Sequence, residues 1–159
     1  MKKKVLFVCW GNICRSPSAE AVFSGLVDRA GLTAEIEIDS AGTIAAHAGE
    51  RADSRMRKHA SKRGYQLNSI SRKINVDHDF EHFDYIIAMD DKNLSDLMYL
   101  ARNEKDLAKL SKMTDYARDL SYSAVPDPYY GGDEGFELVL DILEDACQGL
   151  LTNIQKESS

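Results

Sequence analysis

VLFV, residues 5–8, runs directly into the loop CWGNICRS, residues 9–16, and this stretch decides the fold. The apolar run is mostly β-branched or aromatic, which predicts a short strand that is covered on both faces and lies centrally in a parallel sheet. After the loop, Ser16 and Pro17 predict the N-cap and the first turn of a helix. Apolar residues at helical spacing continue to Ala30, and Gly31 is the expected end of that helix.

The rest of the chain continues this alternation of strands and helices. We expect further strands at residues 35–38, 83–89 and 108–113, and helices at residues 53–63, 92–100 and 136–155. Asp53 is the expected N-cap of the second helix, residues 39–42 the end of the second strand, and residues 121–132 a loop. The alternation predicts an α/β fold in a single domain, residues 1–159, with a central four-stranded parallel sheet and helices on both faces.

The composition is that of a soluble globular domain: of 159 residues, 43% are hydrophobic and 29% are charged. The net charge of −6 argues against a nucleic-acid partner, which would require a basic face. The first apolar run is too short for a signal peptide, and no apolar stretch approaches the roughly 20 residues that span a bilayer. We therefore expect a cytoplasmic protein without a membrane partner.

The three cysteines are Cys9, Cys14 and Cys147, an odd number without the spacing of metal ligands. In a chain without a signal peptide this pattern indicates free thiols, not a disulfide framework or a zinc site. Cys147 lies on the apolar side of the last predicted helix, so we expect it in the core. No metal and no cofactor are expected.

The loop at residues 9–16 has the features of an anion site. Ligands of parallel sheets bind beyond the carboxyl ends of the strands, where backbone amides and a helix N-terminus attract negative charge. Arg15 adds a planar fork that matches two phosphate oxygens. The same field would stabilise a thiolate at Cys9 and make it a nucleophile. The alternative, an inert buried cysteine beside a surface arginine, stays open on these residues alone.

A thiolate that attacks phosphorus expels an alkoxide or phenoxide, so a general acid is needed. Asp127 is the candidate because Pro126 and Pro128 stiffen its loop and hold its side chain outward. The alternative is that these three residues form a simple turn.

VCWGNICRSP, residues 8–17, followed by Ala19 and Glu20, resembles the signature of the low-molecular-weight protein tyrosine phosphatases. The resemblance extends along nearly the whole chain and includes DSAGT at residues 39–43, SR at 71–72, FDYI at 83–86 and DPYYG at 127–131. It implies a Rossmann-like phosphatase fold and metal-independent hydrolysis of phosphotyrosine and small aryl phosphates.

The resemblance implies catalytic roles for four residues. Cys9 would form a phosphocysteine intermediate, and Arg15 would bind the phosphoryl oxygens. Asp127 would protonate the leaving phenol and then deprotonate the attacking water. Ser16 would hydrogen-bond the sulfur of Cys9 and help it leave.

The resemblance also implies which residues surround the phosphate. The phosphate-binding positions would be Trp10, Gly11, Asn12, Ile13, Cys14 and Arg15. Asn12 tolerates a left-handed backbone and would support the loop through Ser40. Trp10, Tyr129 and Tyr130 would form aromatic walls of the cleft. The alternative for Trp10 is ordinary core packing.

Three features of the loop region bear on the individual behaviour of this chain. The family often has Leu in place of Trp10, so the rim is expected to be bulkier here. Many members have an aromatic residue in the segment that matches residues 44–47; Ala46 in this chain is small, so one side of the cleft is expected to be more open. Cys14 would form a reversible disulfide with Cys9, as family members can. The alternative is that Cys14 is only a small residue that packs the loop.

The expected partners are phosphotyrosine-containing proteins as substrates and phosphate or other oxyanions as inhibitors, with the chain a monomer or a weak dimer. His47 and His59 have no assigned role and are expected to be surface or packing residues.

Three alternative functions remain open. An arsenate reductase would need further cysteines, and Cys147 looks buried. A protein arginine phosphatase would carry Thr in place of Ile13. A phosphoprotein-binding module would not need the acid Asp127.

Overall fold

A computed structural model describes residues 2–129 and 131–158 of the chain. Within these residues, four parallel strands form one sheet in the order β2-β1-β3-β4. They are β1 (Lys3–Cys9), β2 (Ile36–Gly42), β3 (Tyr85–Ala88) and β4 (Leu110–Lys112). The predicted four-stranded parallel sheet is confirmed.

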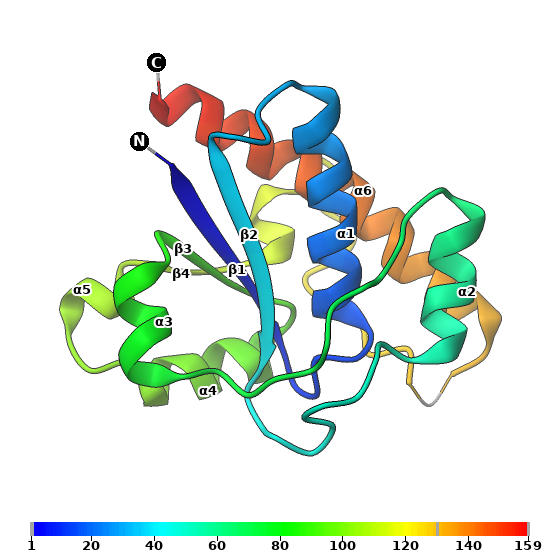
Figure 1. Cartoon of the computed structure of the whole chain (residues 1–159), viewed down its shortest axis with the longest axis horizontal. Helices are drawn as coiled ribbons and strands as arrows, with labels where there is room; N and C mark the ends of the chain where they lie inside the picture. Colours follow the sequence, from blue (N-terminus) through cyan, green and yellow to red (C-terminus); the bar gives the residue numbers. More distant parts are fainter. Residues whose placement is uncertain (1, 130, 159) are drawn as a thin grey trace.

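Helices cover both faces of this sheet (Figure 1). On one face lie α1 (Arg15–Arg29), α2 (Ser54–Lys62) and α6 (Asp133–Ser158). On the other lie α3 (Val76–His82) and α4 (Asp91–Leu100), and the short α5 (Glu104–Leu107) follows α4. A 3₁₀ turn, η1 (Met113–Tyr116), connects β4 to the loop before α6. None of the helices in the described part of the chain is both long and apolar enough to cross a bilayer.

The side chains of β1 alternate between two apolar cores. Phe7 and Cys9 contribute to the core under α1 and α6, whereas Leu6 and Val8 contribute to the core under α3 and α4. This alternation follows from the period of two in a strand, and burial on both faces explains the continuous apolar run. Cys9 is therefore directed to the α1 side at the carboxyl end of the central strand.

The ends of the elements show where the sequence-based expectations were right and wrong. Asp53 caps α2 by accepting the amides of Arg55 and Met56, and Gly31 has a positive φ of 73° after α1, both as predicted. The expected N-cap Ser16 is wrong, because α1 begins at Arg15 and the hydroxyl of Ser16 is used inside the loop. Residues 39–42 belong to β2, and α3, α5 and η1 were not predicted.

Gly42 brings the end of β2 close to the loop after β1. The two strands are paired Cys9 to Gly42, and a Cβ at Gly42 would lie 2.7 Å from the carbonyl oxygen of Trp10. Only glycine permits this approach of two backbones. As a result, the loop after β1 rests on the end of β2 at the carboxyl edge of the sheet.

Candidate active site

A pocket of about 340 Å³ lies at the carboxyl end of β1. Three segments far apart in sequence meet there: the loop at residues 9–15, the loop after β2 and the loop before α6. Its lining residues are Cys9, Trp10, Gly11, Ile13, Cys14, Arg15, His47, Asp127 and Tyr129.

The sulfur of Cys9 is the buried polar centre of the pocket. Its Sγ lies 3.0 Å from the Oγ of Ser16 and accepts a hydrogen bond from the backbone amide of Asn12 at 3.2 Å. Helix α1 begins six residues later, at Arg15, so its unpaired amides are close to the same loop. The sulfur therefore lies beside hydrogen-bond donors and near the positive end of a helix.

Arg15 is a fully oriented cation beside this sulfur. Its Nη1 donates to Asp90 Oδ2 at 2.6 Å and to the carbonyl oxygen of Val125 at 3.1 Å. Burial by itself would lower the pKa of Arg15, but the nearby Cys9 and the hydrogen-bonded Asp90 outweigh it and raise the pKa. The guanidinium is therefore charged, and its direction is set before any ligand arrives.

Asp90 was not predicted as a site residue. It follows β3 directly, and its Oδ1 caps α4 by accepting the amide of Asn93 at 2.7 Å. A carboxylate at the carboxyl end of the neighbouring parallel strand was the available signal, because that edge of the sheet is where sites form.

Asn12 holds the loop at residues 9–16 from the inside. Its backbone is left-handed, with φ 58°, and its Nδ2 donates to Ser16 Oγ at 2.8 Å and to Ser40 Oγ at 3.0 Å. Its Oδ1 accepts the backbone amide of Arg72 at 3.0 Å. One buried carboxamide thus links the loop to β2 and to the segment that precedes α3.

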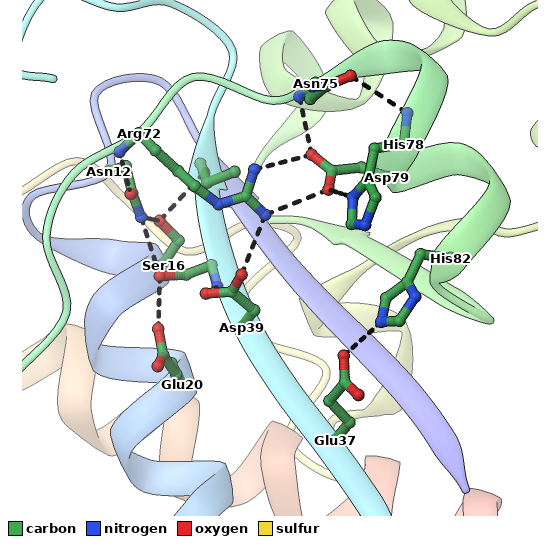
Figure 2. Close-up of polar contacts among 12 residues, drawn as sticks. Asn12, Ser16, Glu20, Glu37, Asp39, Arg72, Asn75, His78, Asp79 and His82 are labelled. Atoms are coloured by element: carbon green, nitrogen blue, oxygen red, sulfur yellow. Dashed lines mark hydrogen bonds and ion pairs between the residues drawn. The ribbon is translucent and has the colours of Figure 1, made fainter.

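Behind Asn12, Arg72 forms the centre of a network of ionic hydrogen bonds (Figure 2). Its guanidinium contacts Asp79 at 2.9 Å and Asp39 at 3.1 Å. Asp79 is completely buried and also accepts the amide of Asn75 at 2.8 Å. Burial would raise the pKa of Asp79, but the hydrogen bonds from Arg72 and Asn75 prevail and lower it. The carboxylate is therefore ionised and fixed.

A second branch of the network runs through Ser40 to Glu20. The hydroxyl of Ser40 accepts from Asn12 and donates to Glu20 Oε1 at 2.6 Å. Burial raises the pKa of Glu20, and the hydrogen bond from Ser40 opposes that rise only in part. Glu20 is the outermost acceptor of a chain of hydrogen bonds that begins at Asn12.

The loop before α6 brings Asp127 to the other side of the pocket. The side chain of Asp127 is 44% exposed, and its Oδ2 lies 3.7 Å from Arg15 Nη2. Its Oδ1 accepts the backbone amide of Tyr129 at 3.0 Å. Val125, at the start of the loop, donates its amide to the carbonyl of Met89 at 2.8 Å and so attaches the loop to the end of β3.

The mouth of the pocket is aromatic. Trp10 is 44% exposed and lines the pocket instead of packing in the core. Tyr129 also lines the pocket, together with His47, whose ring centroid is 6.1 Å from that of Tyr129. His47, for which no role was expected, belongs to this lining, whereas Ala46 does not. Tyr130 lies outside the described residues.

The remaining expectations concern residues away from the reacting centre. Cys147 is fully buried in α6, as predicted. His59 is a packing residue, stacked on Phe136 and hydrogen-bonded to Glu137. Cys14 lines the pocket as a buried free thiol, and burial raises its pKa. Over residues 2–129 and 131–158 there is no cluster of three or more His, Cys, Asp or Glu that could hold a metal ion.

Comparisons with known proteins agree with this geometry. Residues 4–159 match the family model for low molecular weight phosphotyrosine protein phosphatases. A putative low molecular weight protein-tyrosine-phosphatase of Synechocystis sp. is 46% identical over 154 residues, which cover 97% of this chain and 98% of that protein. A crystal structure of a protein tyrosine phosphatase from Entamoeba histolytica, with Hepes in its active site, is similar at a TM-score of 0.95 and 47% identity, over 99% of this chain and 100% of that one.

The structure is also similar to that of a Drosophila arginine phosphatase, with a TM-score of 0.88, 32% identity and coverage of 97% and 98% of the two chains. The match to the family model spans nearly the whole chain and includes both loops of the pocket. The chain belongs to the low molecular weight phosphotyrosine protein phosphatases, a family of hydrolases.

Proposed function

We propose that this protein hydrolyses phosphotyrosine and small aryl phosphates through a phosphocysteine intermediate on Cys9. The observation that carries the proposal is the meeting of three groups in one pocket: the sulfur of Cys9, the guanidinium of Arg15, and the carboxylate of Asp127 only 3.7 Å from that guanidinium. These are the nucleophile, the anion clamp and the proton donor that phosphate monoester hydrolysis requires.

In the first step, the thiolate of Cys9 attacks phosphorus and a sulfur–phosphorus bond forms. The bond from phosphorus to the phenolic oxygen breaks, and the proton of Asp127 goes to that oxygen. Arg15 and the loop amides bind the equatorial phosphoryl oxygens, where charge is spread in the transition state. Because Arg15 is already held by Asp90, little reorganisation is needed when the phosphate binds.

In the second step, water attacks phosphorus and gives a proton to the carboxylate of Asp127. The sulfur–phosphorus bond breaks, and the electron pair returns to the sulfur of Cys9. The hydroxyl of Ser16, 3.0 Å from that sulfur, stabilises the thiolate as it leaves. Inorganic phosphate is released, and it competes with substrate for the same loop.

The aromatic mouth supports an aryl substrate. Trp10 and Tyr129 offer faces to a phenyl ring, and Ile13 contributes an apolar surface to the lining. Phosphoarginine is the second candidate, because the structural likeness extends to an arginine phosphatase. A comparison of hydrolysis rates on phosphotyrosine and phosphoarginine peptides of one sequence separates the two, and a preference for phosphoarginine would overturn the aryl assignment.

The reaction is tested by hydrolysis of p-nitrophenyl phosphate in chelator-treated buffer. Cys9→Ser should lower kcat on the order of 10⁴-fold or more, and Asp127→Ala by about 10²–10³-fold. Cys147→Ala removes a buried thiol that is not in the pocket lining and serves as the matched control, with activity retained. Full activity in Cys9→Ser would contradict the proposal.

Cys14 supports a related proposal, reversible inactivation by peroxide. Two thiols, Cys9 and Cys14, lose two electrons and two protons to hydrogen peroxide, which becomes water, and a disulfide forms. Both sulfurs belong to residues that line the same pocket. Wild-type activity should return with dithiothreitol, and Cys14→Ser should lose that recovery. Equal recovery in the two proteins would contradict it.

A further inference from the structure

Arg55, in the first turn of α2, connects the two catalytic loops of the pocket. Its Nη2 donates to the carbonyl oxygen of Tyr129 at 2.9 Å. The same guanidinium forms a fork with Asp53, with distances of 3.3 Å from Nε and 3.2 Å from Nη2. Arg55 therefore contacts the loop of Asp127 on one side and the N-cap of α2 on the other.

The guanidinium also lies against two aromatic rings. Its Cζ is 5.5 Å from the centroid of Tyr129 and 4.9 Å from that of Phe136, in the first turn of α6. Both distances are in the range of a cation–π contact. A hydrogen bond and two ring contacts together fix the position of the guanidinium relative to the acid loop more closely than a single exposed ion pair would.

Asp53 connects Arg55 to the loop at residues 9–16, the proposed phosphate loop. Its backbone amide donates to the carbonyl oxygen of Ile13 at 2.8 Å, and its carboxylate caps α2. The sequence of contacts runs from Ile13 through Asp53 and Arg55 to Tyr129. It therefore sets the spacing between the loop that holds the nucleophile and the loop that holds the acid.

Tyr129 connects Arg55 to Asp127 through its own backbone. Its backbone amide donates to Asp127 Oδ1 at 3.0 Å, while its carbonyl accepts from Arg55. The carboxylate is otherwise 44% exposed, and its contact with Arg15 is a long 3.7 Å. The residue that orients the carboxylate is thus the residue that Arg55 holds.

We propose that Arg55 is a positioning residue, which holds Tyr129 so that Asp127 points at the leaving oxygen of the substrate. The proposal rests on the general-acid role given to Asp127 above. Arg55 does not line the pocket, so it acts on the reaction through Asp127.

This role has a specific chemical consequence. A displaced general acid slows expulsion of a basic phenol, with a pKa of about 10 as in tyrosine, more than expulsion of the acidic p-nitrophenol. Damage to the phosphate loop would instead slow both substrates equally and weaken oxyanion binding. The dependence on the leaving group distinguishes acid positioning from a general structural effect.

The experiment compares kcat/KM for phenyl phosphate and p-nitrophenyl phosphate in wild type, Arg55→Ala, Arg55→Lys and Asp127→Ala. Arg55→Ala should lose about tenfold on phenyl phosphate and about threefold on p-nitrophenyl phosphate, because a small displacement of a catalytic group is costly. Arg55→Lys keeps the charge but not the planar fork, so it should recover only part of the loss. Lys58→Ala removes a charge from an exposed position of α2 and is the matched control, with both rates unchanged.

One further measurement, the inhibition constant of inorganic phosphate, separates the possible outcomes. The inhibition constant of inorganic phosphate should stay within twofold of wild type in Arg55→Ala, since the phosphate loop remains intact. Equal losses on both substrates, or a weaker phosphate constant, would overturn the positioning role. If Asp127→Ala itself shows no leaving-group dependence, the general-acid assignment fails; if it does and Arg55→Ala does not, only the inference on Arg55 fails.

Discussion

The loop at residues 9–16, proposed to bind phosphate, and the loop before α6, proposed to supply the acid, line one pocket but are held in different ways. They are called the phosphate loop and the acid loop below. In the phosphate loop, Asn12 makes three side-chain hydrogen bonds, and a fully buried carboxylate, Asp79, supports Arg72 behind it. In the acid loop, the side chain of Asp127 is 44% exposed and is oriented by one backbone amide, that of Tyr129.

The difference matches what each loop has to do. Groups that bind the phosphoryl oxygens work best when their dipoles are fixed in advance, because reorganisation during the reaction is then small. In the proposed mechanism, the loop of Asp127 has to admit substrate, and its carboxyl gives a proton to one oxygen and takes a proton from another, so a less enclosed side chain suits it. Substitutions on the two sides should therefore affect different quantities: stability and oxyanion affinity for the phosphate loop, leaving-group dependence for the acid loop.

The largest effect is expected from Asp79→Ala. It leaves Arg72 without its buried partner, so the free energy of unfolding should fall by about 3 kcal/mol in urea denaturation at pH 7. Asp77→Ala, on the same helix with a 95% exposed side chain, is the control and should cost less than about 1 kcal/mol. Because the pKa of Asp79 is lowered in the folded protein, its contribution should be present at neutral pH and lost as the pH falls below about 4. Similar losses of unfolding free energy in the two variants would contradict the conclusion that Asp79 stabilises Arg72.

Asn12 offers a sharper test of the phosphate loop. Asn12→Ala removes three hydrogen bonds and keeps a Cβ at φ 58°, whereas Asn12→Gly removes the same bonds without that strain. Both variants should bind inorganic phosphate about tenfold more weakly, and Ala should be less stable than Gly by about 1 kcal/mol. In both variants kcat/KM should fall by the same factor for phenyl phosphate and for p-nitrophenyl phosphate, whereas in Arg55→Ala the two factors should differ. A leaving-group dependence in either variant would remove the distinction between the two loops.

A smaller effect is expected at the mouth of the pocket. His47→Ala removes a ring that lies beside Tyr129 and close to Gly11, so part of the aromatic wall is lost. KM for phenyl phosphate should rise about threefold, with kcat within twofold, because wall contacts are made equally in the ground and transition states. Steady-state kinetics on the purified variant provide the check, and an unchanged KM would exclude His47 as a wall residue.

The smallest effect is expected from Glu20→Gln, at the outer end of the hydrogen-bond chain. The pKa of Glu20 is raised by burial, so its contribution to stability is greatest at low pH and declines as the pH rises through its folded pKa. Gln can still accept from Ser40 but does not ionise. The urea midpoint of the variant should match wild type near pH 4 and exceed it slightly at pH 7. A midpoint lower than wild type at pH 7 would show that the carboxylate form is the one the network needs.

The residues that could be predicted from sequence are those whose signals are local. The strand, the loop and the helix around Cys9 and Arg15 are contiguous, so their order in the sequence is also their order in space. Asp127 was a candidate only through its flanking prolines and the family resemblance. Asp90, which contacts Arg15, and His47, which lines the pocket, are not contiguous with that segment, because each follows a different strand.

The wrong prediction of Ser16 as the N-cap of the first helix also arises from contacts that the local sequence does not reveal. A serine before a proline is a good N-cap by local chemistry, but its hydroxyl is committed to Cys9 and Asn12 across the loop. Tertiary hydrogen bonds, which a linear pattern does not contain, therefore moved the helix start to Arg15. Arg55 was missed for a related reason: its partner Tyr129 lies 74 residues away.

The hydrogen bond from Arg15 to the carbonyl of Val125 spans 110 residues of sequence. During synthesis, Cys9 and Arg15, the proposed nucleophile and anion clamp, emerge long before the carbonyl of Val125, which helps to orient Arg15, and before Asp127, the proposed acid. A ribosome-bound nascent chain that stops short of residue 125 would thus carry a cysteine and an arginine without a working site. Catalytic turnover in this protein is consequently a reporter of folding, because the site exists only when residues 9–15 have met the loop before α6.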